Sequence, residues 1–264
     1  MNEVKRMSVE SSFTIEVFPP ARQGRGQFDN GKITEIKPID FPGGLSDAKR
    51  IGPLLYWAWA SANGDGVIGM HPHQGFEIMS YVLEGEVGHS DTLKNRMRVG
   101  TGGVQVMQTG SGVYHQEEMF GERTQFFQIW FEPNLREAIQ RDPVYKDFND
   151  EDFPRNSTSG GVEIKTILGG DSPISLVVDA KMIDVSIQPE KTHELALEAG
   201  HSLAAVAVSG SGSWSGEAEA PFATKDFTII KANDHSEITI EAGTDELRLV
   251  IIDVPQKVDY PFFT

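Results

Sequence analysis

The 264-residue sequence contains no cysteine. Disulfides, thiolate metal sites, iron–sulfur clusters and cysteine nucleophiles are therefore excluded, and a reducing, cytoplasmic location is expected. No apolar run approaches the length that a membrane-spanning helix needs, and the first ten residues lack the apolar core of a secretory signal. These absences predict a protein that neither crosses a membrane nor is exported.

Positive charge is also scarce. The chain has 23 Lys and Arg against 39 Asp and Glu, which gives a formal net charge of −16. The excess is uneven, because residues 1–140 hold 13 basic and 17 acidic side chains whereas residues 141–264 hold 10 and 22. So acidic a surface repels nucleic acid and anionic membranes, and neither is an expected partner. The one basic cluster, formed by Lys94, Arg96 and Arg98, is interpreted as a solvated hairpin loop.

Turn-forming residues, by contrast, are frequent, with 27 Gly and 14 Pro. They separate short apolar runs, which is the pattern of strands joined by tight turns and favours a β-sandwich or barrel over βαβ units. In the first half, strands are expected at residues 31–36, 54–60, 76–83, 104–108 and 124–131. In the second half they are expected at residues 162–168, 181–187, 203–208, 227–230, 237–240 and 247–252.

A polar segment separates the two halves. Residues 134–137 read Asn-Leu-Arg-Glu, the form of a capping box, which predicts a short helix to about residue 140. Residues 141–160 combine prolines with a Ser-Thr-Ser-Gly-Gly run and are expected to link two domains, 1–140 and 161–264.

Both halves contain an apolar strand that runs into glycine. The first reaches Gly85, which is expected to mark a tight hairpin, and the second reaches Gly210. This internal echo indicates two copies of one β module.

Histidines and carboxylates gather between residues 71 and 118. His71 and His73 stand two apart, and His115 and Glu117 repeat that spacing about forty residues later, behind a Gly-Ser-Gly turn. Because residues two apart on a strand point to the same face, two adjacent strands can direct three imidazoles and a carboxylate at one point. That is a ligand set for iron, manganese, nickel, copper or zinc. A solvated turn at residues 71–73 is the alternative, which the coincidence in phase of several ligand-type residues disfavours.

Other candidates around this site are less specific. Glu77 shares the face of His71 and His73 if their strand runs unbroken. His89, His193, His201 and His235 lack partner histidines at a suitable spacing and are interpreted as surface or hydrogen-bonded residues. Several large side chains could line a substrate pocket, although each is more typical of a core: Trp57, Phe76, Met79, Tyr81 and Met107.

The residues of this region resemble the pirin family of the cupin superfamily. The resemblance is carried by residues 71–77, 81–87, 103–107 and 110–115. It implies an all-β bicupin fold, with two antiparallel β-barrels of the cupin or jelly-roll type, a short linking helix and metal in the N-terminal barrel alone. It also implies that the metal is iron, as Fe(II), bound by the residues that match the family's ligands, which are His71, His73, His115 and Glu117.

One insertion departs from the family pattern. Pirins commonly read His-x-Glu-Met, whereas this chain has one residue more, with Glu117 and Glu118 both between His115 and Met119. Strand parity favours Glu117 as the ligand, and a bulge would favour Glu118. Glu77 stands where many other cupins have their carboxylate ligand and is a candidate to orient a ligating histidine.

The resemblance also suggests an activity, because some pirins are similar to quercetin 2,3-dioxygenases. It implies a flavonol-like aromatic substrate whose heterocyclic ring takes up O₂, opens and releases carbon monoxide. Glu117 or Glu118 is the expected catalytic base for the substrate hydroxyl. Two alternatives stay open: a non-enzymatic iron-binding regulatory protein that binds a protein partner, and a metal hydrolase or isomerase that uses only Lewis-acid catalysis.

Overall fold

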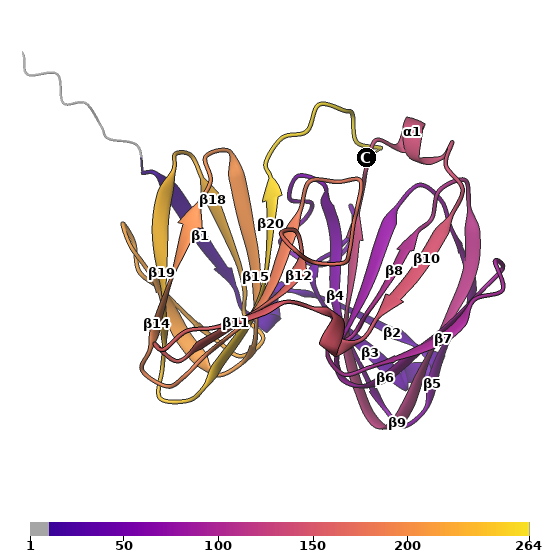
Figure 1. The fold of residues 1–264 in the computed structure, drawn as a ribbon, viewed down its shortest axis with the longest axis horizontal. Coiled ribbons are helices and arrows are strands. Elements are labelled where there is room, and N and C mark those ends of the chain that lie inside the picture. Colours follow the sequence, from indigo (N-terminus) through magenta and orange to yellow (C-terminus); the bar gives the residue numbers. More distant parts are fainter. Residues whose placement is uncertain (1–10, 264) are drawn as a thin grey trace, which may run out of the picture.

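Residues 11–263 are described by a computed structural model, and they form two β-barrels that lie side by side (Figure 1). The predicted all-β bicupin fold is confirmed, with a single short α-helix, α1 (Leu135–Ala138), in the described part of the chain. Asn134 is its N-cap residue, although the Asn134 side chain donates to Glu137 and does not cap the helix backbone. In residues 11–263 no helix is long and apolar enough to cross a membrane.

The first barrel is built on a nine-stranded antiparallel sheet. Its main path is β10-β8-β6-β9-β4-β3-β2, with β5 paired to β9 and β7 to β6. The strands are β2 (Gly24–Phe28), β3 (Ile33–Ile39), β4 (Leu54–Asn63), β5 (Gly66–His73), β6 (Glu77–Asp91), β7 (Arg96–Gly100), β8 (Val104–Gln108), β9 (Val113–Phe131) and β10 (Val144–Phe148).

The second barrel combines a seven-stranded and a four-stranded sheet. The larger sheet contains, in order, β1 (Phe13–Phe18), β18 (Phe227–Ala232), β15 (His201–Ser209), β20 (Leu247–Pro255), β13 (Lys181–Ile187), β12 (Val162–Leu168) and β11 (Arg155–Ser157). The smaller sheet contains β14 (Thr192–Leu197), β19 (Ser236–Ala242), β16 (Ser211–Ser215) and β17 (Ala220–Ala223). Three 3₁₀ turns complete the described elements: η1 (Pro20–Arg22), η2 (Asp29–Gly31) and η3 (Asp150–Asp152).

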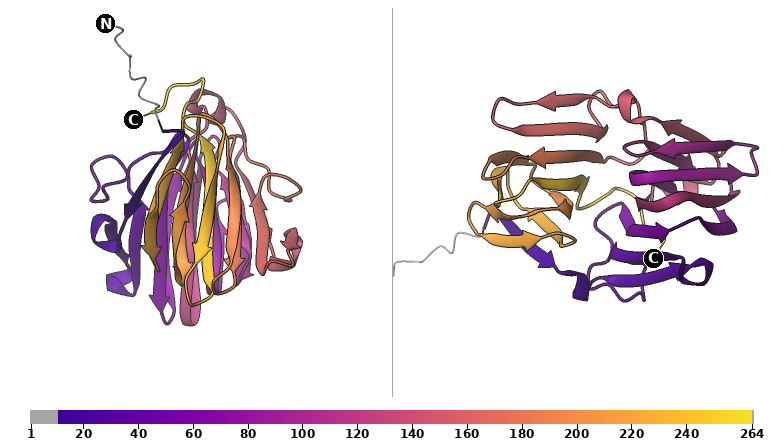
Figure 2. Two further views of the ribbon diagram at one scale, coloured as in Figure 1. Left: turned by 90° about the vertical axis from the view of Figure 1, so that its left-hand side faces the viewer. Right: turned by 90° about the horizontal axis from the view of Figure 1, so that it is seen from below.

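Strand pairing crosses the predicted domain boundaries. β1 lies at the start of the predicted first domain but pairs with β18 of the second barrel. β10, in the predicted 141–160 linker, pairs with β8 of the first barrel, and β11 pairs with β12 of the second. The chain also returns at its end, where the segment after β20 leads back to the first barrel beside α1 (Figures 1 and 2). The two barrels are therefore tied together by the exchange of end segments.

The hairpin predicted at Gly85 is wrong. β6 continues through Gly85, and its register with β9 shifts on both sides of Glu84. Gly85 has φ +81°, and a Cβ there would lie 2.5 Å from the Arg123 carbonyl oxygen, so the position needs glycine for both reasons. The bend lets β6 pair first with β8 and then with β7.

Gly210 occupies a matching place in the second barrel. It has φ +78°, and a Cβ there would lie 2.5 Å from the Glu246 carbonyl oxygen. At both glycines, a backbone carbonyl oxygen from another part of the chain lies too close to leave room for a Cβ. This geometry supports the internal echo that the sequence indicated.

One hydrophobic core spans both barrels. It joins residues of the nine-stranded sheet, such as Trp57 and Phe127, to Phe227 of the second barrel. The Trp57 ring lies 5.3 Å from Phe127 and 6.0 Å from Phe227, both in edge-on geometry. At the same junction the Tyr81 hydroxyl donates to Asp184, which also accepts from the Arg248 guanidinium.

Glu77 is a second link between the barrels and does not lie in the histidine site. The strand of His71 and His73 ends at residue 73, so the expected shared face does not extend to Glu77. Its buried carboxylate accepts from the backbone N–H groups of Val177 and Val178, at 2.7 and 3.0 Å, and from the Gln108 side chain. The proposed role of Glu77 in orienting a ligating histidine is therefore wrong.

Replacing Glu77 by alanine is expected to weaken the junction. The substitution removes the acceptor for two backbone N–H groups, and a buried donor without a partner costs about 1–3 kcal/mol. We expect the free energy of unfolding, measured by urea denaturation, to fall by about 2 kcal/mol or more. Glu86→Ala on the same strand removes an exposed ion pair with Arg98 and should change stability by at most about 1 kcal/mol. Equal effects of the two substitutions would contradict the junction role of Glu77.

Candidate metal centre

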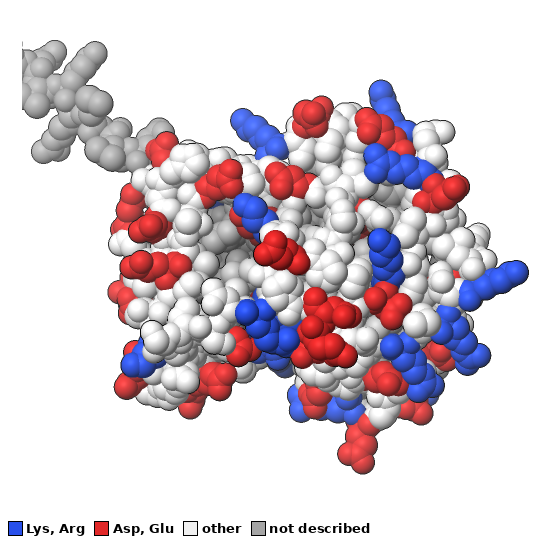
Figure 3. Space-filling model, in the orientation of Figure 1, with Lys and Arg blue, Asp and Glu red and all other residues white. Residues whose placement is uncertain are grey.

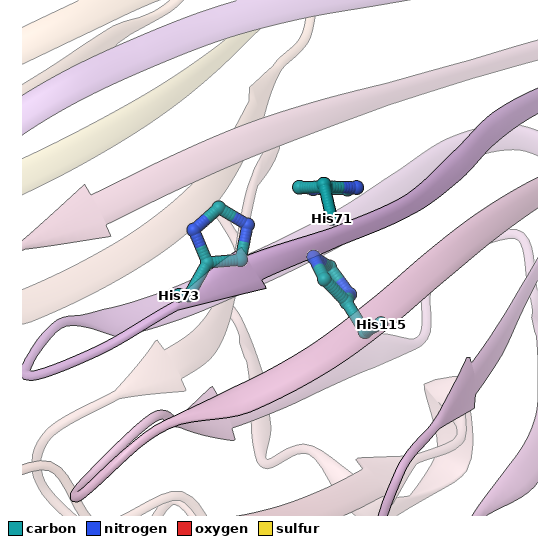
Figure 4. Close-up of side chains that lie close together, drawn as sticks. All are labelled: His71, His73 and His115. Carbon is teal, nitrogen blue, oxygen red and sulfur yellow. The ribbon is translucent and has the colours of Figure 1, made fainter.

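Two neighbouring strands bring three histidines together. β5 and β9 pair antiparallel with His71 directly opposite His115, and His73 lies opposite Val113. The ligand nitrogens of His71, His73 and His115 all lie within 4.8 Å of one another. Figure 4 shows the three imidazoles directed towards a common space, two from β5 and one from β9. The convergence expected from the two-residue spacing is thus present.

The buried nitrogens of this group fit a metal ion. His73 Nε2 and both ring nitrogens of His115 are buried without a hydrogen-bond partner in the described structure. Such orphaned polar atoms are costly, and a divalent cation would satisfy His73 Nε2 and one of the two ring nitrogens of His115. His71 Nδ1 lies 2.7 Å from the Gly69 carbonyl oxygen, which fixes the Nδ1–H tautomer and leaves Nε2 as the ligand atom.

The same burial keeps the imidazoles of His73 and His115 neutral. Desolvation lowers the pKa of His73 to about 3 and that of His115 to about 2, with the neighbouring histidines as a further cause. Neutral imidazole is the form that binds a metal, because the ligand lone pair must be free of a proton.

We expect the metal-free protein to lose stability as the pH falls below about 6.5. His73 and His115 have folded pKa values below their ordinary 6.5, so the unfolded chain binds more protons and the free energy of unfolding rises with pH in this window. Glu117 opposes them, since its folded pKa of about 7 exceeds 4.5 and the folded state binds more protons between these values. Because two histidines lower the free energy of unfolding at acid pH and only one carboxyl raises it, the net effect is a loss of stability. This loss is clearest below about pH 5.

Denaturant midpoints between pH 4 and 8 measure this effect. His115→Asn should flatten the pH dependence, whereas the exposed His235→Asn should leave it unchanged. Parallel curves for the wild type and His115→Asn would contradict the assignment.

Glu117 faces the same interior as His115. Residues 113, 115, 117 and 119 are buried in alternation along β9, and the pairing of β9 with β6 runs without a shift from Glu118 to His115. The pairing of β9 with β5 shifts between Ile68 and His71, which puts the extra residue on β5 and leaves the alternation along β9 intact. Glu118 points to the opposite, half-buried side. Glu117 is not part of the group of nitrogens within 4.8 Å, so its role as the fourth ligand stays a prediction.

The surroundings of Glu117 suit a group that exchanges a proton. The carboxyl is 3% exposed, and burial raises its pKa to about 7. The Ser80 hydroxyl lies 3.1 Å from Glu117 Oε1 and 2.8 Å from Gln128 Oε1. When Glu117 is protonated it can donate to Ser80, which then donates to Gln128.

His89 is a neighbour of the site that sequence reasoning missed. It is buried, its Nε2 lies 2.8 Å from Asp91 Oδ2, and its ring stacks on Tyr145 at 4.0 Å. Its ring centroid is 5.3 Å from that of His115, and it stands opposite Glu117 across β6 and β9. The assumed hairpin at Gly85 concealed this position, since a continuous β6 carries His89 alongside β9.

A cavity of about 460 Å³ opens beside the histidines. One wall is a chain of aromatic rings, in which His73 contacts Trp130 at 4.6 Å, Trp130 contacts Tyr56 at 5.8 Å, and Tyr56 stacks on Phe41 at 4.5 Å. The volume is that of a pocket for a small molecule. The further lining residues are Phe28, Glu35, Lys37, Ile68, Gly69, His71, Glu117, Phe126 and Gln128.

The five large side chains that the sequence suggested as pocket-lining residues do not line this cavity. Five side chains lie instead in the hydrophobic clusters: Trp57, Phe76, Met79, Tyr81 and Met107. Alternation along a strand shows that a residue points inward, but only the packing shows whether the inside is core or cavity.

A second cluster of ligand-type atoms lies on the second barrel. Glu198, His201 and Asp253 have atoms within 4.8 Å of one another. The Lys181 ammonium already lies 3.5 Å from Glu198 and 3.7 Å from Asp253, so a cation of the protein itself balances these carboxylates. That the second barrel binds no metal stays a prediction.

Comparison with known proteins agrees with this geometry. Residues 58–131 match the Pirin family model. Pirin-like protein 2 of Arabidopsis thaliana is 27% identical over 215 residues, which are 78% of this chain and 66% of the relative. A Pseudomonas aeruginosa protein that carries the provisional name quercetin 2,3-dioxygenase is 34% identical over 146 residues, 53% of this chain and 60% of that protein. The chain thus matches less than two thirds of the length of these two relatives.

A solved structure shows the same fold. The bacterial pirin YhhW of Escherichia coli, in complex with nickel(II), superposes with a TM-score of 0.71 at 22% identity, over 92% of this chain and 99% of that one. The sequence match lies in the barrel that carries the three histidines, and the structural match covers both barrels. The chain is therefore similar to the pirin family in sequence over residues 58–131, and both of its barrels share the fold of a solved pirin structure.

Proposed function

We propose that this protein is a metal-dependent dioxygenase that opens the heterocyclic ring of a flavonol-like substrate such as quercetin. The observation that carries the proposal is the group of three converging imidazoles, two of which carry buried nitrogens without a partner in the described structure, beside an aromatic cavity. The likeness to a protein provisionally named quercetin 2,3-dioxygenase supports the choice of substrate.

His71, His73 and His115 would bind the metal, with Glu117 as the fourth ligand. The proposed ion is Fe(II), although this ligand set also accepts Mn, Ni, Cu and Zn. When bound, the metal would supply Lewis-acid activation of the substrate oxygen and of O₂.

The chain itself would position the substrate and move its proton. Rings of Phe41, Tyr56 and Trp130 would offer apolar surface to an aromatic ligand and exclude water from it. Glu117, with a pKa of about 7, can accept the proton of the substrate hydroxyl near neutral pH. Glu118 lies on the other face of β9 and does not line the cavity, so Glu117 is the proposed base.

An oxygen-uptake assay tests the proposal. Iron-loaded protein should consume quercetin and O₂ in a one-to-one ratio and release carbon monoxide, and it should show no turnover under argon. Turnover that is equal with and without O₂ would indicate the hydrolase or isomerase alternative. A panel of flavonols left untouched in air would reject the dioxygenase.

The second candidate is an iron-binding regulatory protein without turnover. The observation that favours it is the uneven charge, because most of the acidic excess lies in residues 141–264. Figure 3 shows acidic side chains spread over the second barrel, at left, where they offer a surface to a basic protein partner. Absence of turnover, together with metal-dependent binding of such a partner, would favour this candidate.

A further inference from the structure

We propose that Glu35, Tyr56 and Lys37 form a subsite that recognises phenolic hydroxyl groups of the ligand. The inference rests on the proposed function, since it takes the same cavity to hold the substrate. All three side chains line the cavity. The Trp130 ring contacts both His73 and Tyr56, so the indole adjoins the histidines and this group of polar side chains.

Glu35 has hydrogen-bonding capacity that the protein leaves unused. The residue is 5% exposed, yet the only donor within hydrogen-bonding range of its carboxylate in the described structure is the Tyr56 hydroxyl, at 3.3 Å from both oxygens. A hydroxyl that donates to a carboxylate usually lies at 2.5–2.7 Å, and two carboxylate oxygens accept about four bonds. A buried carboxylate this poorly satisfied, on a cavity wall, is suited to a donor from a ligand.

Lys37 supplies the complementary donor. Its Nζ lies 3.7 Å from Glu35 Oε2 and 3.7 Å from Asp40 Oδ1, which is ion-pair distance but longer than a hydrogen bond. Asp40 is otherwise engaged, since its two oxygens accept from the backbone N–H groups of Phe41 and Leu45. The Lys37 ammonium therefore has N–H groups available to a ligand oxygen.

The neighbouring strand is shaped to admit these side chains. Gly26 of β2 stands opposite Glu35 of β3, and a Cβ at Gly26 would lie 2.5 Å from Glu35 Oε2 and 2.9 Å from Lys37 Cε. Any other residue at this position would displace the carboxylate or the lysine stem. The glycine thus leaves the pair free to turn towards the cavity.

This arrangement specifies a chemical class of ligand. One hydroxyl donates to Glu35 while an adjacent hydroxyl oxygen accepts from Lys37, a pattern that a ring with two vicinal hydroxyls fulfils. Quercetin has such a pair on its pendant ring, whereas galangin has the same flavonol core and none there. A site built to bond a hydroxyl discriminates against the analogue that lacks it, and we expect quercetin to bind at least about 10-fold more tightly than galangin.

Titration under argon tests the subsite apart from turnover, with quenching of tryptophan fluorescence as the measure of binding. The iron-loaded wild type, Glu35→Gln, Lys37→Met and the control Lys32→Met are each titrated with both flavonols. Lys32 is exposed and lies outside the cavity lining, so its variant should keep the wild-type preference. Glu35→Gln and Lys37→Met should reduce the preference for quercetin to about 3-fold or less, with galangin affinity nearly unchanged. Thermal unfolding confirms that each variant is folded.

The outcomes separate this subsite from the dioxygenase. An unchanged preference in both variants overturns the subsite, even if the protein consumes O₂. A preference that depends on Glu35 and Lys37 upholds the subsite, even if no O₂ is consumed. A wild type that binds neither flavonol, or both equally, overturns it as well.

Discussion

Replacing His115 by alanine is expected to abolish stable metal binding. His115 is the one histidine that β9 contributes to the group, and both of its ring nitrogens are buried without a partner in the described structure. Loss of an outer-shell partner of a metal site costs about 10–100-fold in affinity, and loss of a direct ligand should cost more. Metal analysis of protein purified after iron loading should show little metal in His115→Ala and in His73→Ala.

A histidine outside the proposed site provides the control for this prediction. His193→Ala removes a histidine of β14 in the second barrel and should retain the wild-type metal content. Because the cavity left by His115 can affect folding, circular dichroism and thermal unfolding of the metal-free proteins accompany the analysis. Full metal content in folded His115→Ala would remove it from the ligand set, and with it the basis of the proposed reaction.

Replacing Glu117 by glutamine is expected to reduce turnover by about 100- to 10,000-fold, the usual contribution of a general base. The amide keeps the volume and the neighbours of the carboxyl but cannot accept the proton of the substrate. If Glu117 is also the fourth ligand, metal affinity should fall too, by less than in His115→Ala, because three imidazoles remain. Steady-state oxygen uptake and metal content are measured on the same preparations.

Glu118→Gln is the matched control for this substitution. It makes the same chemical change one residue along β9, on the face away from the cavity. We expect it to keep wild-type turnover and metal content. If Glu118→Gln were inactive and Glu117→Gln active, the strand parity that selected Glu117 would be contradicted.

The alternation of residue types along the sequence was sufficient to predict many strands and the histidine site of the first barrel. The two-residue spacing of His71 with His73, and of His115 with Glu117, depends only on the alternation of side chains along a strand. The same rule predicted β12 and β13 with the observed bounds. The rule failed at Gly85, because a glycine after an apolar strand is typical of both a bulge and a hairpin. This error hid the position of His89 beside the site.

The sequence by itself determined that the protein is all-β and has no thiol chemistry, since these follow from its composition and its strand pattern. It also determined which three histidines converge, since that follows from the two-residue period of a strand. Tertiary structure decided which strands pair, and therefore that β1 joins the second barrel and that Glu77 serves the junction. It also decided that the cavity is walled by Phe41, Tyr56 and Trp130, with Glu35 and Lys37 in its lining. Contacts between residues distant along the chain depend on strand register and bends, which alternation within a single strand does not encode.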